Sequence, residues 1–223
     1  MIPNLSKFMD HTILKPFAQE KDIVKLCNEA KENNFMSVCI NPCNISIAKE
    51  QLKDTYIKVC TVIGFPLGAN TTTIKALETK EAYELGCDEF DMVINIGALK
   101  DKKYDYVKKD IEAVVKEAKG RIVKVIIETF YLTDEEKAIA SRLASDAGAD
   151  FVKTCTGFND GVATVEDLKI MKANIASNVK LKASSGIRSF ETAKALIDAG
   201  AERLGTSAGA AIIAGQKAEG NDY

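Results

Sequence analysis

Eight short runs rich in β-branched residues alternate along this chain with segments of helical periodicity, and this alternation limits the folds open to it. The runs lie at 7–13, 37–41, 58–65, 89–95, 122–129, 151–157, 180–186 and 203–207. Apolar residues recur at the helical period of about 3.6 residues in intervening segments such as 21–34, 71–86, 106–120 and 133–148. Strict alternation requires parallel strands joined by helical crossovers. Eight such units can close into a (β/α)8 TIM barrel. We predict this α/β fold as one domain over residues 1–223, with a flexible tail from about residue 216.

Residues typical of helix ends stand where the periodic segments begin and stop. Glycines lie at or just past four predicted helix ends, at positions 86, 120, 148 and 200, where a left-handed conformation suits glycine. Thr133 followed by Glu136 fits a capping box. An open, doubly wound sheet is the alternative fold. The chain has no Gly-x-Gly-x-x-Gly after its first strand and no Walker sequence, so nucleotide binding has little support.

Composition excludes several classes of partner. The formal net charge of -2 provides no positive field that would attract nucleic acid or an anionic membrane. The N-terminal segment has no long apolar run, unlike a signal peptide. The uncharged stretch 59–74 contains glycines and a proline, which rules it out as a spanning helix. None of the six cysteines forms a Cys-x-x-Cys pair, so we expect buried reduced thiols in a cytoplasmic protein.

Charged residues interrupt four of the predicted strands. They are Asp91, Lys124, Lys153 and Lys182. Strands of a parallel barrel are buried on both faces and normally read as Val, Ile and Leu, and lysine is rarely buried without a partner. A single such lysine more often points outward or forms a static salt bridge. Four charges on neighbouring strands, only one of them acidic, favour a functional site.

The chemistry of clustered lysines suggests a role for Lys153. An amine beside other cations in a dry site loses its proton more easily. A neutral amine is a nucleophile that forms a Schiff base with a carbonyl. We therefore predict covalent catalysis by Lys153, with Lys182 as the neighbouring cation. Asp91 would handle protons with Lys182 and a water, and Lys124 is expected as a charge partner or proton relay.

Two loops near the end of the chain predict an anion site. Barrels often bind phosphate with the loops after strands seven and eight, which here are 184–189 and 205–211. Small residues let backbone N–H groups approach an oxyanion, and serine and threonine hydroxyls add donors. Gly157, at the end of the sixth strand, could join them. Glycines also make ordinary tight turns, so one such loop is weak evidence for phosphate binding. Two such loops, after the seventh and eighth strands, are stronger evidence.

The near absence of histidine is informative. His11 is the one histidine, which argues against a zinc or iron centre and against a Ser–His–Asp triad. We expect His11 to make a structural hydrogen bond near the end of the first strand. Cys39, Cys60 and Cys155 are expected to be packing residues.

Five motifs together resemble the deoxyribose-phosphate aldolase family of class I aldolases: MDHTILKP, EFDMVINIGALK, VKVIIET, FVKTCTGF and VKLKASSGIRSFETA. The resemblance runs over residues 9–214. It implies a barrel that reversibly cleaves 2-deoxy-D-ribose 5-phosphate to D-glyceraldehyde 3-phosphate and acetaldehyde, with no metal or organic cofactor. It also implies Lys153 as the Schiff-base residue, with Lys182 and Asp91 handling protons.

Further residues follow from the same resemblance. Three match substrate-hydroxyl contacts: Asp10, Thr12 and Thr156. The phosphate would lie among Gly157, Ser185, Gly186, Arg188, Gly205, Thr206 and Ser207. The family usually has glycine at position 185, where this serine would add a donor or crowd the phosphate, and serine at position 155. Some members use a C-terminal tyrosine to move a proton at substrate C2, so Tyr223 is either a proton relay or passive. A homodimer is expected by analogy.

Two other functions stay open. One is another Schiff-base barrel lyase, with transaldolase-like or dehydratase activity. The other is a catalytically silent barrel that binds a sugar phosphate. Retention of the whole lysine and aspartate set argues for an enzyme over the silent binding protein.

Overall fold

Parallel strands close into a barrel in this computed structural model, which describes residues 2–218. Each strand pairs with the next strand along the chain, and the last pairs with the first. The strands are β1 Met9–Ile13, β2 Ser37–Ile40, β3 Lys58–Ile63, β4 Glu89–Val93, β5 Ile122–Ile126, β6 Phe151–Lys153, β7 Lys180–Ser184 and β8 Ala201–Thr206. The predicted (β/α)8 barrel is confirmed, and the open-sheet alternative is wrong because β8 returns to pair with β1.

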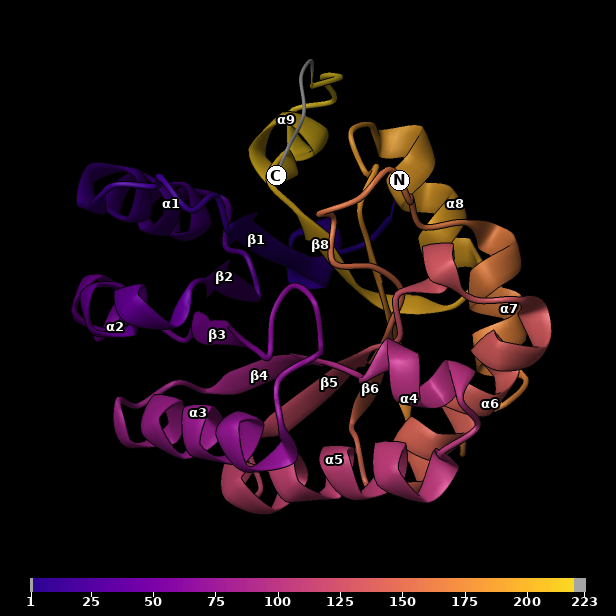
Figure 1. Ribbon diagram of the computed structural model, residues 1–223. Helices are drawn as coiled ribbons and strands as arrows, with labels where there is room; N and C mark the ends of the chain where they lie inside the picture. The colour runs from indigo at the N-terminus through magenta and orange to yellow at the C-terminus, as the bar shows by residue number, and fades with distance from the viewer. Residues whose placement is uncertain (1, 219–223) are drawn as a thin grey trace.

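Helices surround the barrel on its outside (Figure 1). They are α1 Glu20–Glu32, α2 Ile45–Leu52, α3 Thr72–Glu84, α4 Ile96–Lys100, α5 Tyr104–Ala118, α6 Asp134–Asp146, α7 Val165–Lys172, α8 Phe190–Asp198 and α9 Gly209–Ile213. Short 3-10 helices lie at Leu5–Phe8, Pro42–Asn44 and Thr129–Tyr131. The four glycines predicted at helix ends all have positive φ, and the Thr133–Glu136 capping box is present. None of the helices within residues 2–218 is long and apolar enough to cross a membrane.

Alternation along each strand separates two environments. On β5, Val123 and Val125 belong to the apolar core beneath the helices, whereas Lys124 between them points into the barrel. Inside the barrel, a Cβ on Gly205 would lie 2.9 Å from the Cβ of Ser184 and 3.2 Å from Cε of Lys182. Glycine at 205 therefore leaves the space that the Lys182 side chain occupies.

The cysteines are all free thiols. Five are buried, as expected, but Cys43 is exposed. The expectation of burial was wrong for Cys43 because it lies in the 3-10 turn after β2, outside the barrel wall.

Candidate active site

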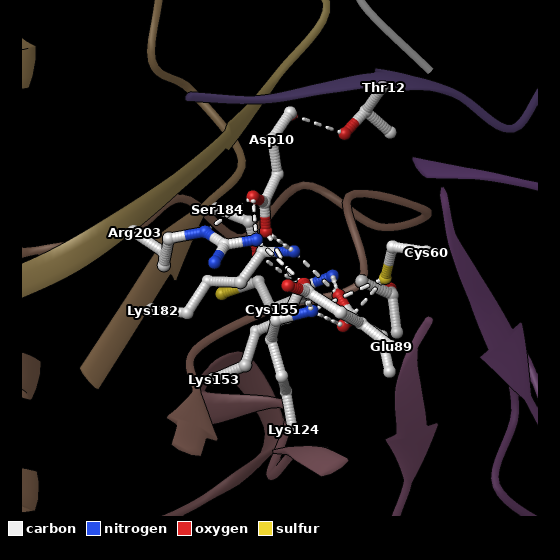
Figure 2. A network of polar contacts seen from close by, with 12 residues as sticks. Asp10, Thr12, Cys60, Glu89, Lys124, Lys153, Cys155, Lys182, Ser184 and Arg203 are labelled. Atoms are coloured by element: carbon white, nitrogen blue, oxygen red, sulfur yellow. Dashed lines mark hydrogen bonds and ion pairs between the residues drawn. The ribbon is translucent and has the colours of Figure 1, made fainter. Parts of the chain in front are cut away.

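Seven charged side chains contact one another inside the barrel and form what we call the charge cluster. Its members, each at most 5% exposed, are Asp10, Glu89, Asp91, Lys124, Lys153, Lys182 and Arg203. All of them except Asp91 are labelled in Figure 2. They come from β1, β4, β5, β6, β7 and β8, and the strand alternation turns each of them inward. Lys153 is the last residue of β6, at the C-terminal ends of the strands, where barrel enzymes place their chemistry.

Asp91 is the carboxylate that connects the lysines. Its Oδ2 accepts hydrogen bonds from Nζ of Lys153 at 2.8 Å and from Nζ of Lys182 at 2.7 Å. Its Oδ1 accepts one from Nζ of Lys124 at 2.9 Å. Burial alone would raise the pKa of Asp91, but Lys124, Lys153 and Lys182 hold it well below the usual value. Asp91 is therefore ionised at neutral pH.

Asp10 and Glu89 neutralise the other side of the cluster. Oδ1 of Asp10 accepts from Nε of Arg203 at 2.6 Å, and Oδ2 forms a 2.5 Å ion pair with Lys182. Oε2 of Glu89 lies 2.6 Å from both Lys124 and Arg203. Burial lowers the pKa of Lys182, but Asp10 and Asp91 raise it above its usual value. Lys182 is thus held as a cation beside Lys153.

The cluster differs from the sequence-based prediction in its acids. We expected one acid among four charges, and the structure has three carboxylates facing four cations. Glu89 and Arg203 were missed, although Glu89 stands two residues before Asp91 on the same strand, and period-two alternation points both the same way. With all seven groups ionised the cluster carries one excess positive charge, and loss of one lysine proton would balance it.

Asp10 and Thr12 occupy a different setting from the substrate contacts expected of them. The Asp10 carboxylate is fully buried, and its Oδ1 also accepts a 2.7 Å hydrogen bond from the Ser37 hydroxyl. The Thr12 hydroxyl donates to the Asp10 carbonyl at 2.8 Å. Both side chains are thus engaged within the barrel wall and the charge cluster.

The loops expected to bind phosphate gather at the ends of β6, β7 and β8. Gly157, Ser185 and Gly186 all have positive φ. Ser185 Oγ donates to the Gly161 carbonyl at 2.6 Å, and Thr206 Oγ1 donates to the Ile187 carbonyl at 2.7 Å. Each hydroxyl proton is thus directed to a loop carbonyl in this structure, and the contact of these residues with phosphate stays a prediction.

Gly205 is the next-to-last residue of β8, beside Lys182, and its phosphate contact stays a prediction. Arg188 and Ser207 are partly buried on the two loops, with Arg188 just before α8 and Ser207 just after β8. The phosphate contacts expected of Gly157, Gly186, Arg188 and Ser207 stay predictions. Tyr223, the predicted proton relay, lies outside the described residues.

The structural role predicted for His11 is confirmed, whereas Cys60 makes polar contacts that were not expected. His11 points outward, and its Nε2 lies 2.7 Å from Oε2 of Glu29, so the expected structural hydrogen bond is confirmed. Cys60 is more than a packing residue, because its thiol lies 3.2 Å from Oδ1 of Asp91 and accepts from Lys124 at 3.3 Å. Donor atoms of Cys39, Cys60 and Asp91 lie within 4.8 Å of one another, a spacing that a soft metal ion could bridge. Lys124 already supplies positive charge there, and burial raises the pKa of Cys60 well above its usual value, which disfavours the thiolate that a metal needs.

Comparison with known proteins agrees with this geometry. The family model of the DeoC/LacD family aldolases matches residues 5–215. The chain belongs to the DeoC/LacD aldolase family. It is 58% identical over 219 residues to the deoxyribose-phosphate aldolase of Streptococcus sanguinis (strain SK36), covering 98% of this chain and 99% of that protein.

Two solved structures have a similar fold. "QR15, an Aldolase" matches with a TM-score of 0.90 and 40% identity, over 95% of both chains. The deoxyribose phosphate aldolase of Aeropyrum pernix, described as a unique tetramer, matches with a TM-score of 0.87 and 30% identity, over 94% of this chain and 89% of that one. The resemblance to deoxyribose-phosphate aldolases is confirmed, and with it the enzyme class, a lyase.

Proposed function

We propose that this chain reversibly cleaves 2-deoxy-D-ribose 5-phosphate to D-glyceraldehyde 3-phosphate and acetaldehyde through a Schiff base on Lys153. The observation that carries the proposal is the pair of lysine amines on one oxygen of Asp91, at 2.8 and 2.7 Å. Two buried ammonium groups so close together repel each other. The electrostatic cost falls when one of them is neutral, and a neutral amine is what imine formation requires.

In the cleavage direction, the Lys153 amine attacks C1 of the open-chain sugar, and loss of water gives the protonated imine. A base then removes the proton of the C3 hydroxyl, and the C2–C3 bond breaks as its electron pair moves into the imine. Glyceraldehyde 3-phosphate leaves. The resulting enamine is protonated at C2, and water hydrolyses the new imine to release acetaldehyde and the free lysine.

Asp91 and Lys182 are the groups we assign to the proton steps. Ionised Asp91 accepts a proton relayed through water from the C3 hydroxyl, and protonated Lys182 keeps that carboxylate in place. Lys124 holds the other oxygen of Asp91 and is a positioning residue. The phosphate group binds the loops around Gly157 and Gly186, whose positive φ lets N–H groups converge on an anion.

Borohydride trapping tests this proposal directly. Enzyme, acetaldehyde and borohydride are mixed, and the modified peptide is mapped by mass spectrometry. We expect an ethyl group on Lys153. Labelling of Lys182 alone would reverse the assignment. Tight binding of deoxyribose 5-phosphate without a trapped imine would favour a silent binding protein, and trapping without acetaldehyde release would favour another Schiff-base lyase.

We also propose a homodimer that works in the cytoplasm, on small-molecule substrates alone. The Aeropyrum pernix relative is described as tetrameric, so self-association occurs in an enzyme similar to this chain. All six cysteines here are free thiols, as a reducing compartment favours. Light scattering should give a mass twice the 24.2 kDa of one chain. A mass of one or four chains would contradict the dimer.

A further inference from the structure

Glu128 is a buried carboxylate that the proposed mechanism does not use. It lies two residues beyond the end of β5 and is 2% exposed. Its φ of 56° lies in the left-handed region that residues with side chains seldom adopt. The Glu128 carbonyl accepts from the Tyr131 N–H at 3.1 Å, which closes the following 3-10 turn and holds the backbone in this conformation. The side chain is thereby aimed at the end of β6.

The carboxylate binds one residue there, Thr156. Its Oε2 accepts from the Thr156 hydroxyl at 2.5 Å and from the Thr156 N–H at 3.2 Å, and its Oε1 lies 3.4 Å from the same N–H. Hydrogen bonds to an ionised acceptor are stronger than those between neutral groups. The hydroxyl proton of Thr156 is therefore committed to Glu128.

Because the Thr156 hydroxyl donates its proton to Glu128, it can act toward a ligand only as an acceptor. A hydroxyl has one proton and two acceptor lone pairs. The proton goes to Glu128, and one lone pair accepts the N–H of Phe158 at 3.1 Å. What remains is a single lone pair, so Thr156 can only accept a hydrogen bond from a ligand.

Thr156 lies between the two ends of the proposed substrate site. It is three residues beyond Lys153 and directly before Gly157 of the phosphate region. It is as buried as Lys153, which must contact substrate, with 1% exposed against 3%. Of the hydroxyls between C1 and the phosphate, that on C3 gives up its proton in cleavage. The hydroxyl on C4 keeps its proton and is free to donate it.

We propose that Glu128 is a positioning residue that fixes the Thr156 hydroxyl as the acceptor for the C4 hydroxyl of the substrate. It thereby sets the preference for an aldehyde that carries this hydroxyl. The inference rests on the proposed function, in which glyceraldehyde 3-phosphate supplies C3 to C5 of the product. Its C2 hydroxyl becomes the C4 hydroxyl of the sugar.

The test runs the reaction in the direction of synthesis with acetaldehyde and two acceptors. One is glyceraldehyde 3-phosphate, and the other is 3-phosphooxypropanal, which lacks only the hydroxyl. The measured quantity is the ratio of kcat/KM for the two acceptors. Thr156→Val, which removes the hydroxyl, and Glu128→Met, which removes its acceptor, should each lower this ratio about three- to tenfold. The double variant should lower it no further, because both act on one interaction.

Two matched variants separate positioning from general damage. Glu128→Gln keeps an acceptor oxygen and should stay within about twofold of the wild-type ratio. Glu135→Gln removes an exposed carboxylate on α6 and should leave the ratio unchanged.

Several results would overturn the inference. If Glu128→Met slows both acceptors equally, Glu128 is merely structural. If Glu128→Met does not fold, Thr156→Val still decides, since an unchanged ratio there removes the proposed contact. Borohydride trapping on each variant keeps this outcome distinct from a failure of the proposed function, in which the wild-type enzyme would itself give no imine and no product.

Discussion

Lys153 and Lys182, register partners on β6 and β7, donate to the same oxygen of Asp91. Parallel pairing places the two residues side by side, and their side chains turn inward together because both occupy the same phase of the strand alternation. One carboxylate oxygen thus bridges two amines. Both amines are buried, so each lies close to the charge of the other.

Lys182→Met should slow the enzyme by a factor of about 10² to 10⁴, the usual contribution of a proton-handling group. Borohydride trapping of acetaldehyde on Lys153 should persist, because Lys153 keeps its hydrogen bond to Asp91. Trapping and product formation measured on the same variant separate imine formation from the proton steps. Lys180→Met is the matched control, because Lys180 begins the same strand and has an exposed side chain. Loss of trapping on Lys153 in Lys182→Met would contradict a role of Lys182 in the proton steps alone.

Asp91→Asn should destabilise the fold and flatten its pH dependence in acid. Removing one partner of a buried ion pair costs about 3–5 kcal/mol in the free energy of unfolding. The pKa of Asp91 is lowered in the folded state. Its stabilising contribution is therefore complete above the unfolded value of about 3.9 and is lost as pH falls below it. Urea unfolding between pH 2.5 and 7 measures this. A variant as acid-sensitive as the wild type would show that Asp91 is not the group responsible.

Lys75 and Asp110 form a second buried ion pair, outside the barrel, that links α3 to α5. Nζ of Lys75 lies 2.5 Å from Oδ2 of Asp110. It also donates a hydrogen bond to the carbonyl of Val93 at 2.9 Å, and Val93 lies two residues after Asp91 on β4. Lys75→Met or Asp110→Leu alone should lower the free energy of unfolding by about 3–5 kcal/mol. The double variant should cost less than the sum of the two. Replacing the exposed pair Lys108 and Glu112 in the same way should cost at most about 1 kcal/mol. Additive losses for Lys75 and Asp110 would contradict the pairing.

Ser185→Gly should change stability and phosphate binding only slightly. Serine at a φ of 80° is strained, and glycine relieves that strain, but the change also removes the hydrogen bond to the Gly161 carbonyl. The two effects are each about 1 kcal/mol and oppose each other. Because the hydroxyl faces Gly161, KM for deoxyribose 5-phosphate should change less than about threefold. Gly186→Ala serves as the comparison and should raise KM more, because a Cβ there would lie 2.6 Å from Cγ1 of Val162 and disturb the loop proposed to bind phosphate. A tenfold fall of KM in Ser185→Gly would mean that the serine crowds the phosphate.

Much of the fold could be read from local pattern. The predicted strand 89–95 contains β4 Glu89–Val93, and the predicted helix 133–148 contains α6 Asp134–Asp146. Both depend on periodicity and on capping residues close in the chain, which are properties of a single segment. The same alternation places Lys153 inside the barrel, because it fixes which residues of a strand share a face.

The partners of these residues were decided by barrel closure. Asp10 and Arg203 are 193 residues apart in the chain, and their ion pair exists because β8 returns to β1. A pattern within one segment cannot predict a contact across that distance. The sequence therefore predicted three lysines beside one acid, whereas the structure has four cations beside three carboxylates. The Ser185 and Thr206 hydroxyls are a second case, since the direction of a hydroxyl proton depends on which carbonyl the folded loops bring near it. Periodicity within single segments specified the strands, the helices and the inward lysines, because each of these depends on residues close together in the chain. The charge balance around Lys153 and the binding of Thr156 by Glu128 arise from closure of the barrel, because both require contacts between different strands.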